Sequence, residues 1–538
     1  HRDAAGGAPR TRSAEAELLA AKGMVHERRF LEQWQSAGRR VVEIRSPHEE
    51  GDWGRAAEET RAAMHAGADV IYQGVFVEAP WRGIADFLVK CDTPSDLGAW
   101  SYEAWDTKLA SRAKPAFVLQ LAFYSEQLAR LQGTAPEQMH IVPGTGKTES
   151  FRVAHFGAYY RRVRQRLLRT LETQPATAPY PVSHCRVCHY ADACTAQWQQ
   201  EDHLCRVARI TRPQVQRLQA AGVRTLAALG AVSDTSLPGL RATIVAVLRD
   251  QARLQHEAEQ TGYHRYELLD PRGDAGFARL PSPSPGDVYF DMEGDPYFEG
   301  LRGLEYLFGV MTIDQGVPAF RSWVALSRDE ERQAFEGFID DVRARLERWP
   351  DLHVYHYAAY EKTALRRLAA SHGTREREVE ELLVERQGFV DLYDVVRHAL
   401  RISKDSYSIK ALRTFFMQVE AGAVNDGGQS IVVFEHFLET HDPEQLQAII
   451  DYNREDCRST VLLHQWLLAR RQEAEAQWQC AIPWWVPDRV PPSPARVDED
   501  ARVVAQCAAL RAKGTAAATV LADLLPYHQR EARPAWVR

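Results

Sequence analysis

The sequence predicts an α/β protein that is divided into several domains. The chain has 538 residues, enough for about three or four domains of ordinary size. Apolar runs of strand length alternate with helical stretches in two blocks, and a Pro/Ser/Gly segment, "LPSPSPGD" at 280–287, marks a boundary between them. The aromatic content of 9% and the charged content of 26% are typical of folded protein, so we expect little disorder.

The composition also limits the location and the partners. No stretch has the roughly 18–20 uncharged apolar residues of a membrane span, and the first residues lack the apolar core of a signal peptide. We therefore expect a cytoplasmic protein without a membrane partner. The net charge of −7 argues against general coating of nucleic acid but allows a local basic groove. The chain does not begin with Met, so we expect a fragment.

The first block, residues 1–205, contains a candidate metal site. Residues 14–38 predict a helix with His26, "WRGIADFLVK" predicts a strand with Asp86, and "SYEAWDTKLA" predicts a strand with Asp106 and Lys108 on one face. Two carboxylates suit a hard divalent cation such as Mg²⁺ or Mn²⁺, His26 is a further ligand candidate, and the lysine can orient or deprotonate a water. Ordinary surface charges are the alternative for each residue taken alone.

The order of these residues resembles the RecB-type PD-(D/E)XK nucleases, which have a restriction-endonuclease-like fold. A helical His, Gly-x-x-Asp, Asp-x-Lys and the helix "AFVLQLAFYSEQLARL" follow one another here as they do in that group. The resemblance implies a metal site of His26, Asp86, Asp106 and Lys108. It also implies that Gln120 and Tyr124 approach DNA.

Cysteines gather at the end of this block. Cys185, Cys188 and Cys194 have the spacing C-x2-C-x5-C, and His203 and Cys205 follow. The spacing indicates metal rather than disulfides in a chain without an export signal. The resemblance implies a 4Fe-4S cluster, although no cysteine precedes Cys91 to supply the fourth ligand. Zinc completed by Cys205 or His203, and packed thiols without metal, remain alternatives.

"HIVPGTGKTESFRV" at 140–153 contains the end of a phosphate-binding loop, Gly144 to Thr148. Such a loop needs Gly at position 141, which is Ile, and it needs a helix afterwards, where this sequence alternates like a strand. Pro143 also removes a backbone N–H donor. We therefore predict a hairpin with strands at 139–142 and 149–153, and no ATP site.

The second block, residues 288–475, contains acids in unusual places. Asp291 and Glu293 lie two apart inside the apolar run "VYFDMEGDPY", so both side chains face one side of a strand. Glu361 is at a strand–helix junction, and Tyr452 and Asp456 are four apart on a helix. Four converging carboxylates would repel one another without cations, so the set predicts a site for two divalent metal ions that cleaves a phosphodiester.

The order Asp-x-Glu, acid, Tyr-x-x-x-Asp resembles the DnaQ-like (DEDD) 3′–5′ exonucleases of the RNase H superfamily. "HYAAYE", "VDLYDVV" and "SYSIKAL" resemble the YprB-type branch of that group. The resemblance implies that Asp291, Glu293, Glu361 and Asp456 bind metal and that Tyr452 positions the attacking water. Scattered surface acids, or a decayed site that only binds, are the alternatives.

The remaining segments are expected to connect or to bind. Residues 206–265 resemble a helix-hairpin-helix module, with a plain helical spacer as the alternative, and 266–287 read as a linker. The helix after residue 151 has six arginines and no acid up to Thr170, so Arg161 and Arg162 are candidates for contact with a nucleic-acid backbone. Residues 476–538 read as a Pro-rich linker and helices. Proteins that join these two nuclease types often continue into a helicase, which is absent here.

The sequence as a whole predicts a metal-dependent nuclease with two sites. DNA is the expected substrate, in repair, recombination or processing, and RNA is not excluded. A helicase domain or subunit is an expected partner. The alternative is a DNA-binding module that targets a helicase and has one or both sites silent.

Overall fold

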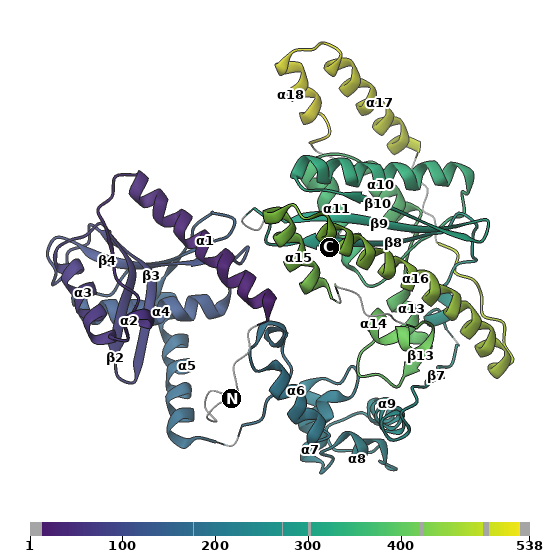
Figure 1. The fold of residues 1–538 in the computed structure, drawn as a ribbon, viewed down its shortest axis with the longest axis horizontal. Helices are drawn as coiled ribbons and strands as arrows, with labels where there is room; N and C mark the ends of the chain where they lie inside the picture. The colour runs from purple at the N-terminus through teal and green to yellow at the C-terminus, as the bar shows by residue number, and fades with distance from the viewer. Residues whose placement is uncertain are drawn as a thin grey trace.

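The structure is a computed structural model of the chain. It describes residues 13–175, 177–271, 273–299, 303–418, 424, 426–487 and 494–527. Two mixed β-sheets with helices packed on them form its two largest parts, and a group of shorter helices connects them along the chain (Figure 1). The predicted α/β class is confirmed. Within the described ranges, no helix is both long and apolar enough to cross a membrane.

The first sheet has six strands in the order β1-β2-β3-β4-β5-β6. Their bounds are Val41–Glu43 (β1), Val70–Glu78 (β2), Trp81–Cys91 (β3), Ser101–Lys108 (β4), Gln138–Pro143 (β5) and Glu149–Arg152 (β6). The pairs β1–β2 and β4–β5 are parallel, and the other neighbours are antiparallel. The two strands predicted around Asp86 and Asp106 are β3 and β4.

Helices pack on this sheet and bury its apolar side chains. They are α1 (Ala14–Ser36), α2 (Pro47–Glu50), α3 (Trp53–His65), α4 (Pro115–Gln132) and α5 (Val153–Thr173). The helix α4 begins with Pro115 in its first turn and ends at Gly133, whose left-handed backbone suits glycine. Leu121 and Leu128 of α4 are fully buried against the sheet. The helices predicted at 14–38 and 116–131 are therefore confirmed.

The stretch that resembled a phosphate-binding loop is a β-hairpin. β5 and β6 pair in antiparallel register, with Ile141 opposite Glu149. Gly146 closes the turn with φ +76 and donates its N–H to the Pro143 carbonyl at 2.8 Å. The predicted hairpin is confirmed, since a strand follows where a phosphate-binding loop requires a helix. The absence of an ATP site stays a prediction.

The middle of the chain is helical. Its elements are η1 (Ser183–Val187), α6 (Ala191–Gln200), η2 (Leu204–Arg206), α7 (Arg212–Ala220), α8 (Leu226–Gly230) and α9 (Ala242–Thr261). A turn at Ala221 and Gly222 follows α7, with Gly222 at φ +87. However, Asp202 already accepts the N–H groups of Leu226 and Ala227 at 2.8 Å each. These donors are not available to a phosphate, which favours the spacer interpretation of this hairpin.

The second sheet has five strands in the order β10-β9-β8-β11-β12. Their bounds are Val288–Asp295 (β8), Leu304–Asp314 (β9), Val317–Val324 (β10), Val354–His356 (β11) and Phe389–Asp391 (β12). β8 is antiparallel to β9 and parallel to β11, and β11 is parallel to β12. The expected strand and helix alternation after Val288 is confirmed.

Helices cover both faces of the second sheet (Figure 1). They are α10 (Arg328–Arg348), α11 (Tyr360–His372), α12 (Glu376–Glu380), the π-helical turn η4 (Glu381–Glu385), α13 (Leu392–Ala399), α14 (Ile409–Leu412), η5 (Arg413–Phe415), α15 (Gly427–Thr440) and α16 (Pro443–Trp478). Side chains of β8 alternate between these layers. Phe290 stacks on Phe338 of α10, with ring centroids 4.0 Å apart, whereas Tyr289 faces α16 and bonds to His464.

Residues 266–287, expected as a linker, pack into the second block. β7 (Tyr266–Leu268) pairs with β13 (Leu400–Ile402). In and beside η3 (Gly276–Arg279), Phe277 and Leu280 are buried in the core that α13 and α16 share. Trp485 returns from beyond α16 and donates its N–H to the Leu280 carbonyl at 2.9 Å. This stretch is therefore no free connection, while the predicted domain boundaries stay a prediction. The helix pair α17 (Pro494–Arg511) and α18 (Ala516–Leu524) follows.

Helix α1 contacts both blocks. It packs on β4 of the first sheet and on α15 of the second block (Figure 1). Lys22 of α1 donates to Asp295 Oδ2 at 3.2 Å, to the Tyr297 carbonyl at 3.3 Å and to Glu435 Oε1 at 2.5 Å. The Asp295 side chain is fully buried and that of Lys22 is 17% exposed. One lysine therefore holds two acids of the second block against the first.

Lys22→Ala is expected to destabilise the protein because it leaves two largely buried acids without their shared cation. The loss is about 1–3 kcal/mol, which calorimetry of the full chain will detect as a lower melting temperature. Lys147→Ala is the control, because Lys147 lies exposed in the β5–β6 turn. Equal melting temperatures for the two variants would contradict the role given to Lys22.

Candidate active site

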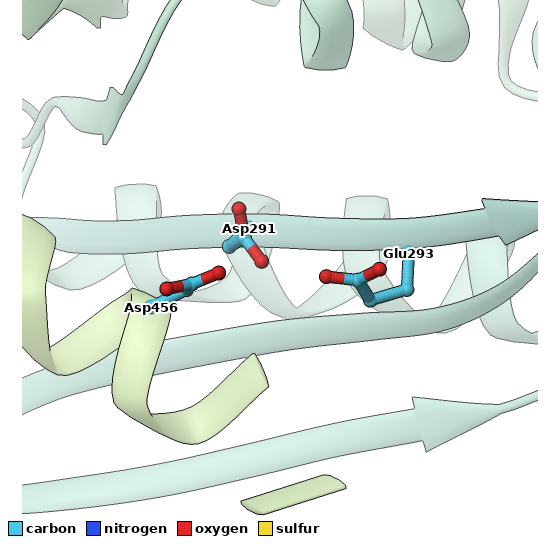
Figure 2. Close-up of side chains that lie close together, drawn as sticks. All are labelled: Asp291, Glu293 and Asp456. Carbon is cyan, nitrogen blue, oxygen red and sulfur yellow. The ribbon is translucent and has the colours of Figure 1, made fainter. Parts of the chain in front are cut away.

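Three carboxylates converge between β8 and α16. Asp291, Glu293 and Asp456 each offer an oxygen, and these oxygens all lie within 4.8 Å of one another (Figure 2). Glu293 and Asp456 are buried and Asp291 is half-buried. The alternation of β8 places both of its acids on the α16 face, and α16 supplies the third. Three of the four acids predicted for this site are therefore brought together.

Burial and mutual repulsion raise the pKa of each carboxyl. The pKa of Asp291 lies well above its ordinary value, because of burial first and then of Asp456 and Glu293. Burial and the Asp456 charge raise the pKa of Glu293 to about 8. Burial also raises the pKa of Asp456, against the opposing effect of Arg413 and Lys410. The site therefore holds more negative charge than the chain's own cations balance.

Two cations and a tyrosine lie beside Asp456. Arg413 donates to Asp456 Oδ1, and it is held in place by its second bond, to Ser459 Oγ at 2.8 Å. Lys410 Nζ donates to the Tyr452 hydroxyl at 2.8 Å, and Tyr452 lies close enough to Asp456 to lower the pKa of that carboxyl. Tyr452 thus lies where the sequence predicted it, four residues before Asp456 on the same face of α16.

Asn453 holds Asp291 in position. Its Nδ2 donates to Asp291 Oδ2 at 2.8 Å, and the Asn453 side chain is fully buried. Gly309 of β9 pairs with Asp291 in the sheet, and a Cβ at Gly309 would overlap the amide oxygen of Asn453. A glycine is required here by close approach rather than by backbone conformation.

Glu361, the fourth predicted ligand, lies beside the group of three. It is buried in the first turn of α11 and lies 3.2 Å from Nδ1 of His356, which is on β11. Its charge raises the pKa of Asp291, so it lies near the site, but it is not part of the group of three. Its role as a metal ligand stays a prediction.

The first block also brings its predicted acids near one another. Asp106 is fully buried on β4, and its Oδ2 lies 2.5 Å from Lys108 Nζ. Asp86 Oδ2 accepts bonds from the Thr107 N–H and hydroxyl at 2.7 Å each. Burial and the Asp86 charge raise the pKa of Asp106 to about 7, against the effect of Lys108. These side chains do not form a group as tight as the one at β8.

Glu27, rather than His26, faces this first group. His26 Nε2 lies 3.1 Å from the Val142 carbonyl oxygen. Glu27 accepts a bond from Gln73, and burial and the charge of Asp86 raise the pKa of Glu27. Gln73 has φ +58 in the middle of β2, opposite Asp86, a strained backbone that is common at functional sites. The acid next to the predicted His is thus the residue that the sequence pattern missed.

The residues expected to approach DNA fall in two places. Gln120 donates to the Tyr124 hydroxyl at 3.0 Å, and that hydroxyl donates to the Ile84 carbonyl of β3 at 2.6 Å. This pair therefore braces α4 against the strand that carries Asp86. Arg161 and Arg162 are exposed on α5.

The cysteines lie in and around η1, α6 and η2. Cys185, Cys188, Cys194 and Cys205 are all half-buried and unpaired. Tetrahedral zinc would bring thiolates to about 3.8 Å from one another, and among the described residues no three of these cysteines, with or without His203, gather within 4.8 Å. The residues present therefore do not fit zinc as they stand. The iron–sulfur cluster stays a prediction.

The donor set at β8 and α16 fits a hard divalent cation. Carboxylate oxygens are the ligands that Mg²⁺ and Mn²⁺ prefer, and the group of three retains a charge that a cation would neutralise. Arg413, Lys410, Asn453 and Gly309 complete the surroundings and were not predicted as site residues. Only Lys410 had a sequence signal, since it lies in "SYSIKAL".

Comparison with known proteins agrees with this part of the structure. The family model of the RNase_H superfamily matches residues 288–468. This match, with the sheet order and the acids described above, identifies an RNase H-like domain in that segment. Proteins of this superfamily generally act as nucleases on nucleic acids and usually use Mg²⁺ or Mn²⁺. Searches of curated proteins and of solved structures gave no match.

Mg²⁺ is expected to stabilise the protein more at pH 8 than at pH 6. Without metal, the raised pKa values mean that the folded site binds protons which the unfolded chain has released above about pH 4.5. Stability therefore falls as pH rises toward 8, the pKa of Glu293, and a cation reverses this loss. Melting temperatures with and without Mg²⁺ at both pH values measure the effect.

Asp291→Asn serves as the control for this measurement. It removes one charge from the group, so it is expected to raise the metal-free melting temperature at pH 8 and to reduce the shift caused by Mg²⁺. An Mg²⁺ shift that stays the same in this variant would show that the ion binds elsewhere.

Gly309→Ala is expected to destabilise the protein by about 1–3 kcal/mol, because the new methyl group displaces Asn453 from Asp291. The Mg²⁺-induced shift in melting temperature should fall with it. Gly427→Ala is the matched control, since a Cβ at Gly427 meets no atom within 4 Å. Similar behaviour of the two variants would contradict the packing argument.

Proposed function

We propose that this protein is a metal-dependent nuclease whose 3′–5′ exonuclease-type site is formed by Asp291, Glu293 and Asp456. The observation that carries the proposal is the meeting of three carboxylates within 4.8 Å inside a segment that matches the RNase_H superfamily. Phosphodiester hydrolysis at two divalent ions is the chemistry that such a group supports best. DNA is the substrate we propose, in repair or processing.

The side chains around the group have distinct tasks in this proposal. Bound divalent ions would neutralise the scissile phosphate and activate a water. Asn453 and Arg413 orient Asp291 and Asp456, so the carboxylates are held in place before substrate arrives. Tyr452 presents its hydroxyl next to Asp456, where it can hold the attacking water, and Lys410 fixes that hydroxyl from the other side.

We propose a second nuclease site of the PD-(D/E)XK type in the first block. Its support is the buried Asp106 beside Lys108, with Asp86 on the neighbouring strand and Glu27 near enough for the charge of Asp86 to raise its pKa. Lys108 is placed to hold or deprotonate a water near Asp106. Glu27 takes the place that the sequence pattern gave to His26.

The two sites are tested by Asp291→Ala and Asp106→Ala, alone and together, on 5′- and 3′-labelled single strands with Mg²⁺ or Mn²⁺. Asp291→Ala is expected to lower shortening from the 3′ end by about two orders of magnitude. Asp106→Ala is expected to remove the remaining cleavage. Asp451→Ala is the control, because Asp451 is exposed on α16 near Asp456.

The possible outcomes separate the proposals. Unchanged cleavage in the double variant rejects both sites. Cleavage lost in one single variant alone assigns the whole activity to that site. The unmodified chain could instead bind the strands and cleave them with neither metal. That result supports the alternative of a nucleic-acid-binding module with silent sites.

A further inference from the structure

Helix α5 leaves a whole face open. None of its 21 residues is buried. On one side, Tyr160 donates to Glu126 of α4 at 2.7 Å, and Arg164 pairs with Glu126 at 3.3 Å and lies over the ring of Trp81. These contacts attach α5 to α4 and to the start of β3.

The opposite side of α5 carries cations at helical spacing. Arg162, Arg166 and Arg169 lie at i, i+4 and i+7, so they share one face, and Arg161 borders it. All four are exposed, and they are called the arginine strip below. Tyr159, which is 58% exposed, lies three residues before Arg162 at the edge of the same face. The arginine strip extends over about 10 Å of helix.

The arginine strip lacks the paired acids that several other exposed arginines of the chain have. Arg55 pairs with Glu59 at 3.1 Å and Arg343 with Glu378 at 3.6 Å, and Arg321 pairs with Asp341. Over the described part of the chain, no member of the arginine strip has an ion pair, and Arg164 is the arginine of α5 that has one. Like charges one turn apart repel, so this arrangement does not stabilise the helix.

The position of α5 relates the arginine strip to the first site. α5 packs on α4, which carries Gln120 and Tyr124, and Tyr124 is bonded to β3 two residues before Asp86. Trp81, beneath Arg164, begins the same strand. A chain bound along the arginine strip therefore lies on the outer side of α5, with α5 between it and the helix that braces the acids of the first block.

We propose that the arginine strip holds the phosphate backbone of a single nucleic-acid strand and that Tyr159 stacks on one of its bases. Unpaired cations in a chain of net charge −7 fit a polyanion, and an exposed aromatic ring beside them fits an unpaired base. The nucleic-acid class of the ligand rests on the proposed function. The binding does not require cleavage.

The test is fluorescence anisotropy of a labelled single strand with the full chain, in EDTA, at several salt concentrations. Replacing all four arginines of the strip by Gln is expected to weaken binding at least tenfold and to lower the slope of log K against log salt by about 3, since each phosphate contact contributes about 0.7. The matched control replaces four ion-paired arginines by Gln and has the same net charge. These are Arg55, Arg61, Arg321 and Arg343.

Equal weakening in the strip variant and the matched control would overturn the proposal. Tyr159→Ala should weaken binding without a change in slope, and Tyr159→Phe should restore it; a changed slope or no rescue refutes the stacking role. Tighter binding of a duplex than of a single strand rejects the single-strand assignment. Parallel measurements with DNA and RNA of the same sequence compare the two polymers. Because EDTA prevents cleavage, a failed nuclease assay and a failed binding test are independent results.

Discussion

The repulsion among Asp291, Glu293 and Asp456 is the constraint on which the second block depends. Two unit charges about 5 Å apart interact by roughly 3–4 kcal/mol at an effective dielectric constant of 20, and this group contains three such pairs. The three carboxylates stay together despite this repulsion because packing on both faces of the sheet fixes β8 and α16. Neighbouring side chains reduce the repulsion only in part: Asn453 donates to Asp291, and Arg413 pairs with Asp456.

The same strand builds the core and the site. Phe290 and Met292 of β8 enter the core under α10, while Asp291 and Glu293 point the other way, so packing sets the direction of the acids. Two residues beyond Glu293, Asp295 meets Lys22 of α1. Since α1 also carries Glu27, one helix is attached to the strand of one site and contributes an acid to the other. The geometry of the two sites is therefore linked through a single element.

The sequence predicted the acids better than their surroundings. Asp291 and Glu293 could be found because charged residues are rare inside an apolar strand. Asn453 and Gly309 could not be found in this way. Their roles depend on the close approach of β9 and α16, which the sequence pattern does not reveal. The position of Glu27 beside Asp86 could not be found for a related reason: adjacent helical residues point about 100° apart, and only packing decides which one faces the strand. Glu361 was placed near the site, but its pairing with His356 had no sequence signal.

The acids of the first block and those at β8 and α16 differ in how nearby cations balance their charge. This difference gives the two groups different needs for an added metal ion. In the first block, Lys108 lies 2.5 Å from Asp106, and Asp86 accepts two bonds from Thr107. In the second block, Arg413 pairs with Asp456 and with neither of the other two acids of the group, and Lys410 is bonded to the Tyr452 hydroxyl. The cationic side chains of the protein therefore neutralise less of the negative charge at Asp291 and Glu293. The stronger electrostatic demand for added cations lies at β8 and α16, whereas the first group already holds a basic side chain next to its buried acid.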